Sequence, residues 1–261
     1  MSYLNGQEGY RESLLNTRSI VKKGNYVILE VDGLVKNVVP GYVKCDVSIL
    51  GSPEMGASFA DYIVSVYKDG YNDGIGGDGI ESFLYVISGT VKAKNADEEA
   101  VLTEGGYFYS PADKPMTFVN ASDETAKLYV YRRRYTPYKK LKAHTVARNQ
   151  HDMEWVESDG MKNCHVKDLL PASGDFGFDM NMHILKLAPG ASHGYIETHF
   201  QEHGMYFLQG KAMYRLDDTW IPLQKGDYCF MDSYCPQCCY AVGTEDYIYI
   251  FSKECNRDIS L

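Results

Sequence analysis

Hydrophobic and polar residues alternate along much of the chain, which is the pattern of β-strands. In residues 178–184, apolar side chains occupy the even positions and polar side chains the odd ones, which predicts a half-buried strand. Short apolar and aromatic runs predict further strands at 84–87, 107–109, 128–131, 228–231 and 247–251. Gly, Pro, Asn and Asp separate these runs at intervals typical of sandwiches and barrels, so we expect an all-β fold. Helical patterns are scarce, and residues 9–20 and 166–170 are modest candidates.

The chain also resembles itself at an offset of 121 residues. Residues 83–89 are similar to residues 204–210, and, with a one-residue adjustment, residues 102–108 are similar to residues 223–229. The pattern of residues 127–132 returns near the C-terminus, from residue 246 onward. Two copies of one β module are the simplest interpretation of this repeat.

The repeat predicts a two-domain organisation. We expect an N-terminal domain over residues 1–140, a linker over residues 141–176 and a C-terminal domain over residues 177–261. A chain of this length is long enough for two small β domains with substantial cores.

The segment between Gly190 and Gly210 contains the strongest candidates for chemistry. Glu197, His199 and His203 fall within seven residues. On a strand, Glu197 and His199 would project to one face about 6–7 Å apart. His203 has the same parity, so it could close a pocket after a turn. One carboxylate and two imidazoles with open positions suit a catalytic divalent ion.

His193 gives a weaker signal for a metal site, and the first copy of the repeat gives a negative one. His193 follows a Pro-Gly turn and could equally be a loop residue that a substrate meets. In the first copy, the positions equivalent to the three ligands are Gly76, Asp78 and Ser82. The N-terminal domain is therefore expected to be metal-free, and Glu81 is expected to be an ordinary loop residue.

Charge and cysteine content exclude several function classes. A net charge of −9 argues against a nucleic-acid partner, which would need a basic face. We expect the basic cluster of residues 132–134, with the nearby lysines 139, 140 and 142, to be a solvated segment between domains. Seven cysteines, an odd count without secretory context, indicate reduced thiols in the cytoplasm. Neither a targeting segment nor an apolar stretch of membrane-spanning length is visible, so no membrane partner is expected.

The segment 190–210, followed by Gly226-Asp227 and then Pro236-Gln237, resembles the two signature motifs of the cupin superfamily. Glutamine stands where the last histidine of the second motif would be. This variant in a two-cupin chain looks like the ureidoglycine aminohydrolase family. Further likeness lies at residues 34–37, 179–185 and 256–258, so it covers the whole chain. The resemblance implies a bicupin fold of two double-stranded β-helix (jelly-roll) barrels in tandem.

The family likeness also implies an activity and a site. The activity is the manganese-dependent hydrolysis of (S)-ureidoglycine to (S)-ureidoglycolate and ammonia in allantoin (purine) catabolism, performed by a homo-oligomer. The implied Mn²⁺ ligands are Glu197, His199, His203 and Gln237. The implied substrate contacts are Tyr214, Tyr249 and Lys253, together with Glu197 and Gln237.

Roles can be assigned to these residues as hypotheses. Glu197 would bind the metal and also shuttle a proton between water and the departing nitrogen. Lys253 would pair with the substrate carboxylate. Tyr249 and Lys253 are four residues apart on one predicted strand, hence on one face of it. The cysteines 235, 238 and 239 surround Gln237, and their softer thiolates would favour zinc or iron over manganese.

Other function classes fit the same ligand residues. A cupin oxygenase would consume oxygen with a redox-active metal, and an isomerase would release no ammonia. A non-catalytic cupin would bind a small molecule without turnover. The near-complete ligand set favours an enzyme over the binding protein.

Overall fold

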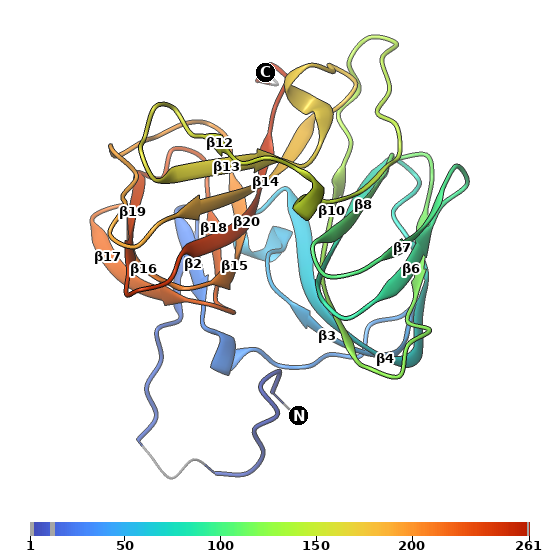
Figure 1. Cartoon of the computed structure of the whole chain (residues 1–261), viewed down its shortest axis with the longest axis horizontal. Coiled ribbons are helices and arrows are strands. Elements are labelled where there is room, and N and C mark those ends of the chain that lie inside the picture. The colour runs from blue at the N-terminus through green and yellow to red at the C-terminus, as the bar shows by residue number, and fades with distance from the viewer. Residues whose placement is uncertain (1–2, 11–13, 260) are drawn as a thin grey trace.

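The computed structural model describes residues 3–10, 14–259 and 261, and it consists of two β units side by side (Figure 1). Within the described residues no α-helix occurs; the helical elements are four 3₁₀ turns, η1 Val31–Gly33, η2 Pro53–Met55, η3 Gln150–Asp152 and η4 Pro171–Ser173. None of these helices is long and apolar enough to cross a membrane. The fold is all-β, as predicted.

The first unit contains a nine-stranded antiparallel sheet. Its order is β11-β8-β5-β10-β4-β9-β6-β7, and β3 pairs with β4. The strands are β3 Tyr42–Ile49, β4 Phe59–Ile75, β5 Ile80–Ser88, β6 Val91–Lys94, β7 Glu99–Leu102, β8 Gly106–Ser110, β9 Met116–Val119, β10 Ala126–Arg134 and β11 Val146–Asn149.

The second unit combines an eight-stranded sheet, ordered β1-β2-β18-β15-β20-β14-β13-β12, with a three-stranded sheet, ordered β17-β16-β19. The eight strands are β1 Ile20–Lys22, β2 Tyr26–Leu29, β12 Val156–Glu157, β13 Cys164–Asp168, β14 Met180–Leu187, β15 His203–Gln209, β18 Tyr228–Met231 and β20 Tyr247–Glu254. The three strands are β16 Lys211–Leu216, β17 Thr219–Gln224 and β19 Gln237–Val242.

The repeat seen in the sequence corresponds to equivalent strands of the two units. The order β8-β5-β10-β4 in the first sheet matches β18-β15-β20-β14 in the second. The repeated segments 83–89 and 204–210 fall on β5 and β15. Strands were correctly predicted at all of the apolar runs named above.

Strand pairing crosses the predicted domain limits. Strands β1 and β2 come from the N-terminal part of the chain, yet β2 pairs with β18 of the second unit. The segment 141–176 contributes β11 to the first sheet and β12 and β13 to the second. The limits at residues 140 and 177 stay a prediction, and the segment between them contains paired strands.

Neither helix candidate from the sequence contains a helix in its described residues. Residues 166–168 belong to β13, so the helix over 166–170 was wrong; the short apolar run pairs with β14 in a sheet. Residues 11–13 lie outside the described part of the chain, and residues 14–19 have no helical structure.

Three apolar cores hold the molecule together. One fills the first unit and one fills the second. The third lies between the two units and is rich in aromatic rings. There the ring centroid of Phe59 lies 4.9 Å from that of Tyr131, with the two rings tilted, and 5.9 Å from that of Phe230, which it meets edge-on. The rings of Tyr129 and Tyr206 stack with centroids 6.2 Å apart. The two units are joined by this aromatic core.

Strand β14 is buried on both faces rather than on one. Met180, Met182 and Ile184 belong to the core between the units. The opposite face, with Asn181 and His183, turns toward the interior of the second unit, and Asn181 is buried. The alternation was read correctly, but the polar face borders the interior of the unit instead of solvent.

Two charged residues also differ from expectation because the units pack on each other. Glu81 is a fully buried residue of β5 that accepts a hydrogen bond from the Tyr109 hydroxyl at 2.5 Å, so the loop assignment was wrong. Arg133 in the basic cluster is largely buried on β10, with its guanidinium 3.7 Å from the Glu254 carboxylate of the second unit. The cluster is therefore not wholly solvated.

A buried acid lies in the core between the units. Asp61 of β4 accepts hydrogen bonds from the Tyr129 hydroxyl at 2.8 Å and from the Gly51 amide at 2.5 Å. Burial nevertheless raises the pKa of Asp61 to about 7, because these donors only partly replace the water that the charged form loses.

This raised pKa predicts a pH-dependent stability. The folded state holds the Asp61 proton more tightly than the unfolded chain does, so its stabilising contribution is complete near pH 4 and is lost as the pH rises to about 7. Asp61→Asn lacks this titration. In urea unfolding, the stability of the wild type relative to the variant should fall over that range by roughly 1.4 kcal/mol per unit of pKa shift. A difference independent of pH would contradict the assignment.

Candidate functional site

The predicted ligands converge inside the second unit although they come from different elements. His203 begins β15 and Gln237 begins β19. Glu197 lies outside the named strands, and its backbone pairs with that of Gln237 through two hydrogen bonds of 3.0 Å. His199 lies in the irregular segment before β15. The expectation that Glu197 and His199 share a regular strand was wrong, because only an isolated bridge anchors this segment.

Two imidazoles and an amide meet at one point. The Nε2 atoms of His199 and His203 are 3.2 Å apart, and the Gln237 amide nitrogen is 3.1 Å from His199 Nε2. Two ligands at right angles on an ion with bonds of about 2.1 Å would be about 3 Å apart. The spacing of these side-chain atoms therefore fits a shared octahedral ion.

Hydrogen bonds orient both imidazoles for metal binding. The Nδ1 atom of His203 lies 2.7 Å from the Ser252 carbonyl, and the Nδ1 atom of His199 lies 3.0 Å from the Gln201 carbonyl. Each carbonyl requires a proton on Nδ1, which leaves both Nε2 lone pairs facing each other. Two acceptors at this distance repel unless a cation or a donor lies between them.

Burial keeps these imidazoles neutral. It lowers the pKa of His199, and the nearby charge of Lys253 lowers it further. The pKa of His203 is lowered well below its ordinary value by complete burial and by His199. Neutral imidazoles are the form that binds metal ions.

The Glu197 carboxylate is adjacent to this point but is not directed at it. Its Oε1 is 3.9 Å from His199 Nε2 and 3.8 Å from His193 Nε2. In the part of the chain that the structure describes, no three His, Cys, Asp or Glu side chains are already placed to hold one ion. Because the Glu197 side chain is 30% exposed, it has room to turn toward the two imidazoles.

The amide of Gln237 has two orientations that exchange its oxygen and nitrogen. In the structure its nitrogen faces His199, and its oxygen lies 3.5 Å from the Tyr214 hydroxyl. A rotation of 180° would direct the oxygen to the imidazoles and the NH₂ group to the tyrosine oxygen. Gln237 therefore fits either a donor role without metal or an oxygen ligand role with it.

A cavity of about 40 Å³ adjoins these groups. It has room for an ion and a few water molecules. Its walls are Leu185, His193, Glu197, His203, Met205, Tyr214, Gln237, Cys238, Tyr249 and Phe251. The sequence had placed His193 only as a weaker candidate, and its imidazole does line the cavity.

Of the predicted substrate contacts, Tyr214 and Tyr249 line the same cavity, together with Glu197 and Gln237. Burial raises the pKa of Tyr214 and of Tyr249 well above the ordinary value, so both hydroxyls remain donors. Tyr249 and Lys253 do share β20 and one face of it, as predicted. Lys253 itself is not in the cavity wall, but its charge reaches both His199 and His203.

Sequence reasoning missed the apolar and imidazole residues beside the ligands. Phe251 meets His203 edge-on at 5.3 Å and stacks on His183 at 4.8 Å. The Nδ1 atom of His183 lies 2.7 Å from Asp168. Strand parity could have identified Phe251, since Tyr249, Phe251 and Lys253 occupy every second position of one strand and therefore share a face.

The cysteines around Gln237 are weak competitors for a metal. Burial raises the pKa of Cys235 to about 11 and also raises the pKa of Cys238 and of Cys239. Their thiols therefore stay protonated, whereas a metal ligand must be a thiolate. Only Cys238 borders the cavity. The donor set of imidazole, carboxylate and amide fits a harder divalent ion.

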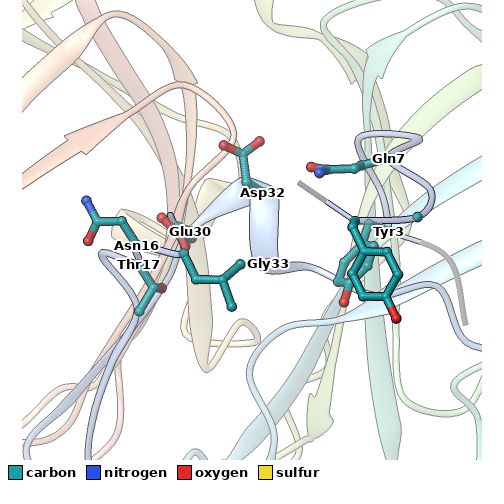
Figure 2. A pocket seen from close by; sticks show the side chains of 10 residues that line it. Tyr3, Gln7, Asn16, Thr17, Glu30, Asp32 and Gly33 are labelled. Carbon is teal, nitrogen blue, oxygen red and sulfur yellow. The ribbon is translucent and has the colours of Figure 1, made fainter. Parts of the chain in front are cut away.

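A much larger cavity, about 660 Å³, lies between the N-terminal arm and the turn η1 (Figure 2). Its acids already have structural partners: Glu30 accepts from the Arg18 amide at 3.0 Å, and Asp32 accepts from the Asn5 side chain at 3.1 Å. The described residues that line it include no imidazole. Despite its larger volume, this cavity is therefore a weaker candidate for the functional site than the small cavity beside His203.

Comparisons with known proteins identify relatives of the whole chain. A sequence profile described as "Cupin domain" matches residues 78–131. The chain is 51% identical to (S)-ureidoglycine aminohydrolase of Escherichia coli K12, with 100% of both chains covered. It is 28% identical to (S)-ureidoglycine aminohydrolase of Arabidopsis thaliana, over 93% of this chain and 79% of the relative. The crystal structure of protein Ylba from E. coli matches with a TM-score of 0.86 at 50% identity, covering 97% of this chain and 100% of that chain.

Such identity over the whole chain, together with the all-β fold, shows that this chain belongs to the (S)-ureidoglycine aminohydrolase family of cupin proteins.

Proposed function

We propose that this chain hydrolyses (S)-ureidoglycine to (S)-ureidoglycolate and ammonia in a Mn²⁺-dependent reaction of purine (allantoin) catabolism. The observation that carries the proposal is the convergence of His199 Nε2, His203 Nε2 and the Gln237 amide, at 3.1 and 3.2 Å. Whole-chain likeness to two named aminohydrolases supports the choice of substrate.

Four side chains would hold the ion. They are Glu197, His199, His203 and Gln237. Two imidazoles, a carboxylate and an amide oxygen form a mixed nitrogen and oxygen set that suits Mn²⁺. The ion, when bound, supplies Lewis acidity toward an oxygen atom of substrate or water.

Substrate orientation would come from the second face of the cavity. The substrate carbon bears an amino group, a ureido group and a carboxylate. Lys253 would pair with that carboxylate, and the protonated hydroxyls of Tyr214 and Tyr249 would donate hydrogen bonds to the substrate. These contacts would present one face of the carbon to water, which accounts for a single stereoisomer of the product.

The reaction breaks one C–N bond, forms one C–O bond and moves a proton from water to the departing nitrogen. Glu197 would carry that proton, which is supported by the position of its partly exposed carboxylate beside the imidazoles. In direct displacement, the proton passes from the attacking water to the departing nitrogen. In the elimination route, the departing nitrogen takes the ureido N–H proton to leave an imine, and the water that then adds returns a proton to the ureido nitrogen. Both routes use the same chain residues.

The proposal also includes the location of the protein and its oligomeric state. We place the activity in the cytoplasm, which the seven free cysteines support. We also expect a homo-oligomer, because exposed sheet edges need to be covered.

The proposed reaction is tested with freshly generated (S)-ureidoglycine. Ammonia and (S)-ureidoglycolate should form in equal amounts, and a chelator should abolish turnover until Mn²⁺ is restored. Racemic product, or turnover that withstands complete metal removal, would contradict the proposal.

Metal content provides a separate test of the ligands. Purified protein should contain about one Mn²⁺ per chain, and His203→Ala should weaken Mn²⁺ binding by about 100-fold or more because it removes one ligand of four. The matched control is His151→Ala, which removes an imidazole paired with Glu104 in the first unit. Two ions per chain would refute the prediction that the N-terminal unit is metal-free.

Steady-state kinetics should separate the roles of the two proposed catalytic residues. With saturating Mn²⁺, Glu197→Gln should lower kcat by about 10²–10⁴-fold, since the amide cannot accept the proton. Lys253→Met should chiefly raise KM, because the substrate loses its partner for the carboxylate. Unchanged kcat in Glu197→Gln, at full metal content, would remove Glu197 from the chemistry.

A further inference from the structure

The segment that begins β15 presents alternate residues to opposite sides. His203 directs its imidazole into the second unit, toward His199. Its two neighbours, Glu202 and Gly204, contact residues of the first unit instead. Because side chains alternate along an extended chain, contacts at Glu202 and Gly204 determine where His203 points.

The first of these contacts is a cluster of hydrogen bonds to Glu202. The Ser58 amide donates to both carboxylate oxygens, at 2.9 and 3.1 Å, and the Ser58 hydroxyl donates to one of them. Glu202 is only 6% exposed, so these donors replace much of the water that its carboxylate has lost. Ser58 immediately precedes β4 of the first unit.

The second contact lies on the other side of His203. A Cβ atom at Gly204 would approach Asp61 Oδ2 and Phe59 Cε2 to 2.7 Å. Glycine thus allows the backbone of β15 to lie directly against β4. Residues 58–61 therefore contact the chain both before and after His203.

A third link joins the same point to β10 and β20. The Glu202 amide donates to the Glu254 carboxylate at 3.1 Å, and the Arg133 guanidinium of the first unit is 3.7 Å from that carboxylate. Glu254 ends β20, the strand whose Ser252 carbonyl lies 2.7 Å from His203 Nδ1. Arg133 is thereby placed to stabilise the strand that orients the imidazole.

We propose that Ser58 of the first unit and Glu202 of the second are positioning residues for the metal site, through which the metal-free unit holds His203 in its binding orientation. This inference rests on the proposed Mn²⁺ site. It gives the N-terminal unit a part in the reaction even though its own equivalent positions, Gly76, Asp78 and Ser82, offer no imidazole.

The test compares Glu202→Gln and Ser58→Ala with a control across the same interface. Tyr135→Phe removes a hydroxyl that donates to the Gly177 carbonyl at 2.8 Å, away from β15. The Mn²⁺ dissociation constant is measured from the electron paramagnetic resonance signal of free Mn²⁺. Hydrogen exchange of residues 199–206 is measured in the metal-free protein, together with its thermal unfolding.

Glu202→Gln is expected to weaken Mn²⁺ binding by about 10-fold or more, within the range for residues that support metal ligands. Ser58→Ala should have a smaller effect in the same direction, because its amide still donates. Both should speed exchange in residues 199–206, and Tyr135→Phe should change neither quantity. Ser58→Ala loses only one hydroxyl, so it provides the test if Glu202→Gln fails to fold.

The proposal is overturned if Mn²⁺ affinity and exchange in both variants equal those of the wild type, or if Tyr135→Phe changes them as strongly. Failure of the proposed function has a different signature, in which wild-type protein itself binds no Mn²⁺. Exchange in the metal-free protein still reports then whether Ser58 and Glu202 hold this segment.

Discussion

Burial of aromatic surface between the two β units is the constraint on which the rest of this structure depends. Phe59, Tyr131 and Phe230 are almost completely buried there, and side chains of this size each remove roughly 150–250 Å² from water. At about 25 cal/mol per Å², burial of each side chain contributes several kcal/mol to the folded state. Each unit covers the aromatic sheet face of the other, because residues of both contribute to this shared core.

Once that face is buried, strand alternation decides where the site lies. Tyr206 and Ile250 belong to the core between the units, whereas Met205 and Tyr249 turn into the second unit. His203 has the parity of Met205 and so faces the same interior. Packing between the units and the placement of the imidazoles are consequences of one alternating pattern.

Because the units pack on each other, several charged groups are buried between them. Arg133, Glu81 and Glu254 are all largely removed from water, and burial raises the pKa of Glu81 well above its ordinary value and that of Glu254 to about 7. A buried pair such as Arg133 and Glu254 contributes little net stability, but it links β10 of the first unit to β20 of the second. On our proposal, this link is what the metal site requires from the N-terminal unit.

The sequence by itself determined the all-β class, the duplication and the cluster of Glu197, His199 and His203, because each depends on local alternation or on spacing along the chain. Gln237 was predicted only through the family resemblance. It did not reveal that β1 and β2 complete the second sheet, that Glu81 and Arg133 are buried, or that Ser58 contacts Glu202. Those facts join residues more than a hundred positions apart or depend on which faces of the two units meet. Only tertiary packing selects among such partners, since a strand pattern specifies which residues share a face but not what covers it.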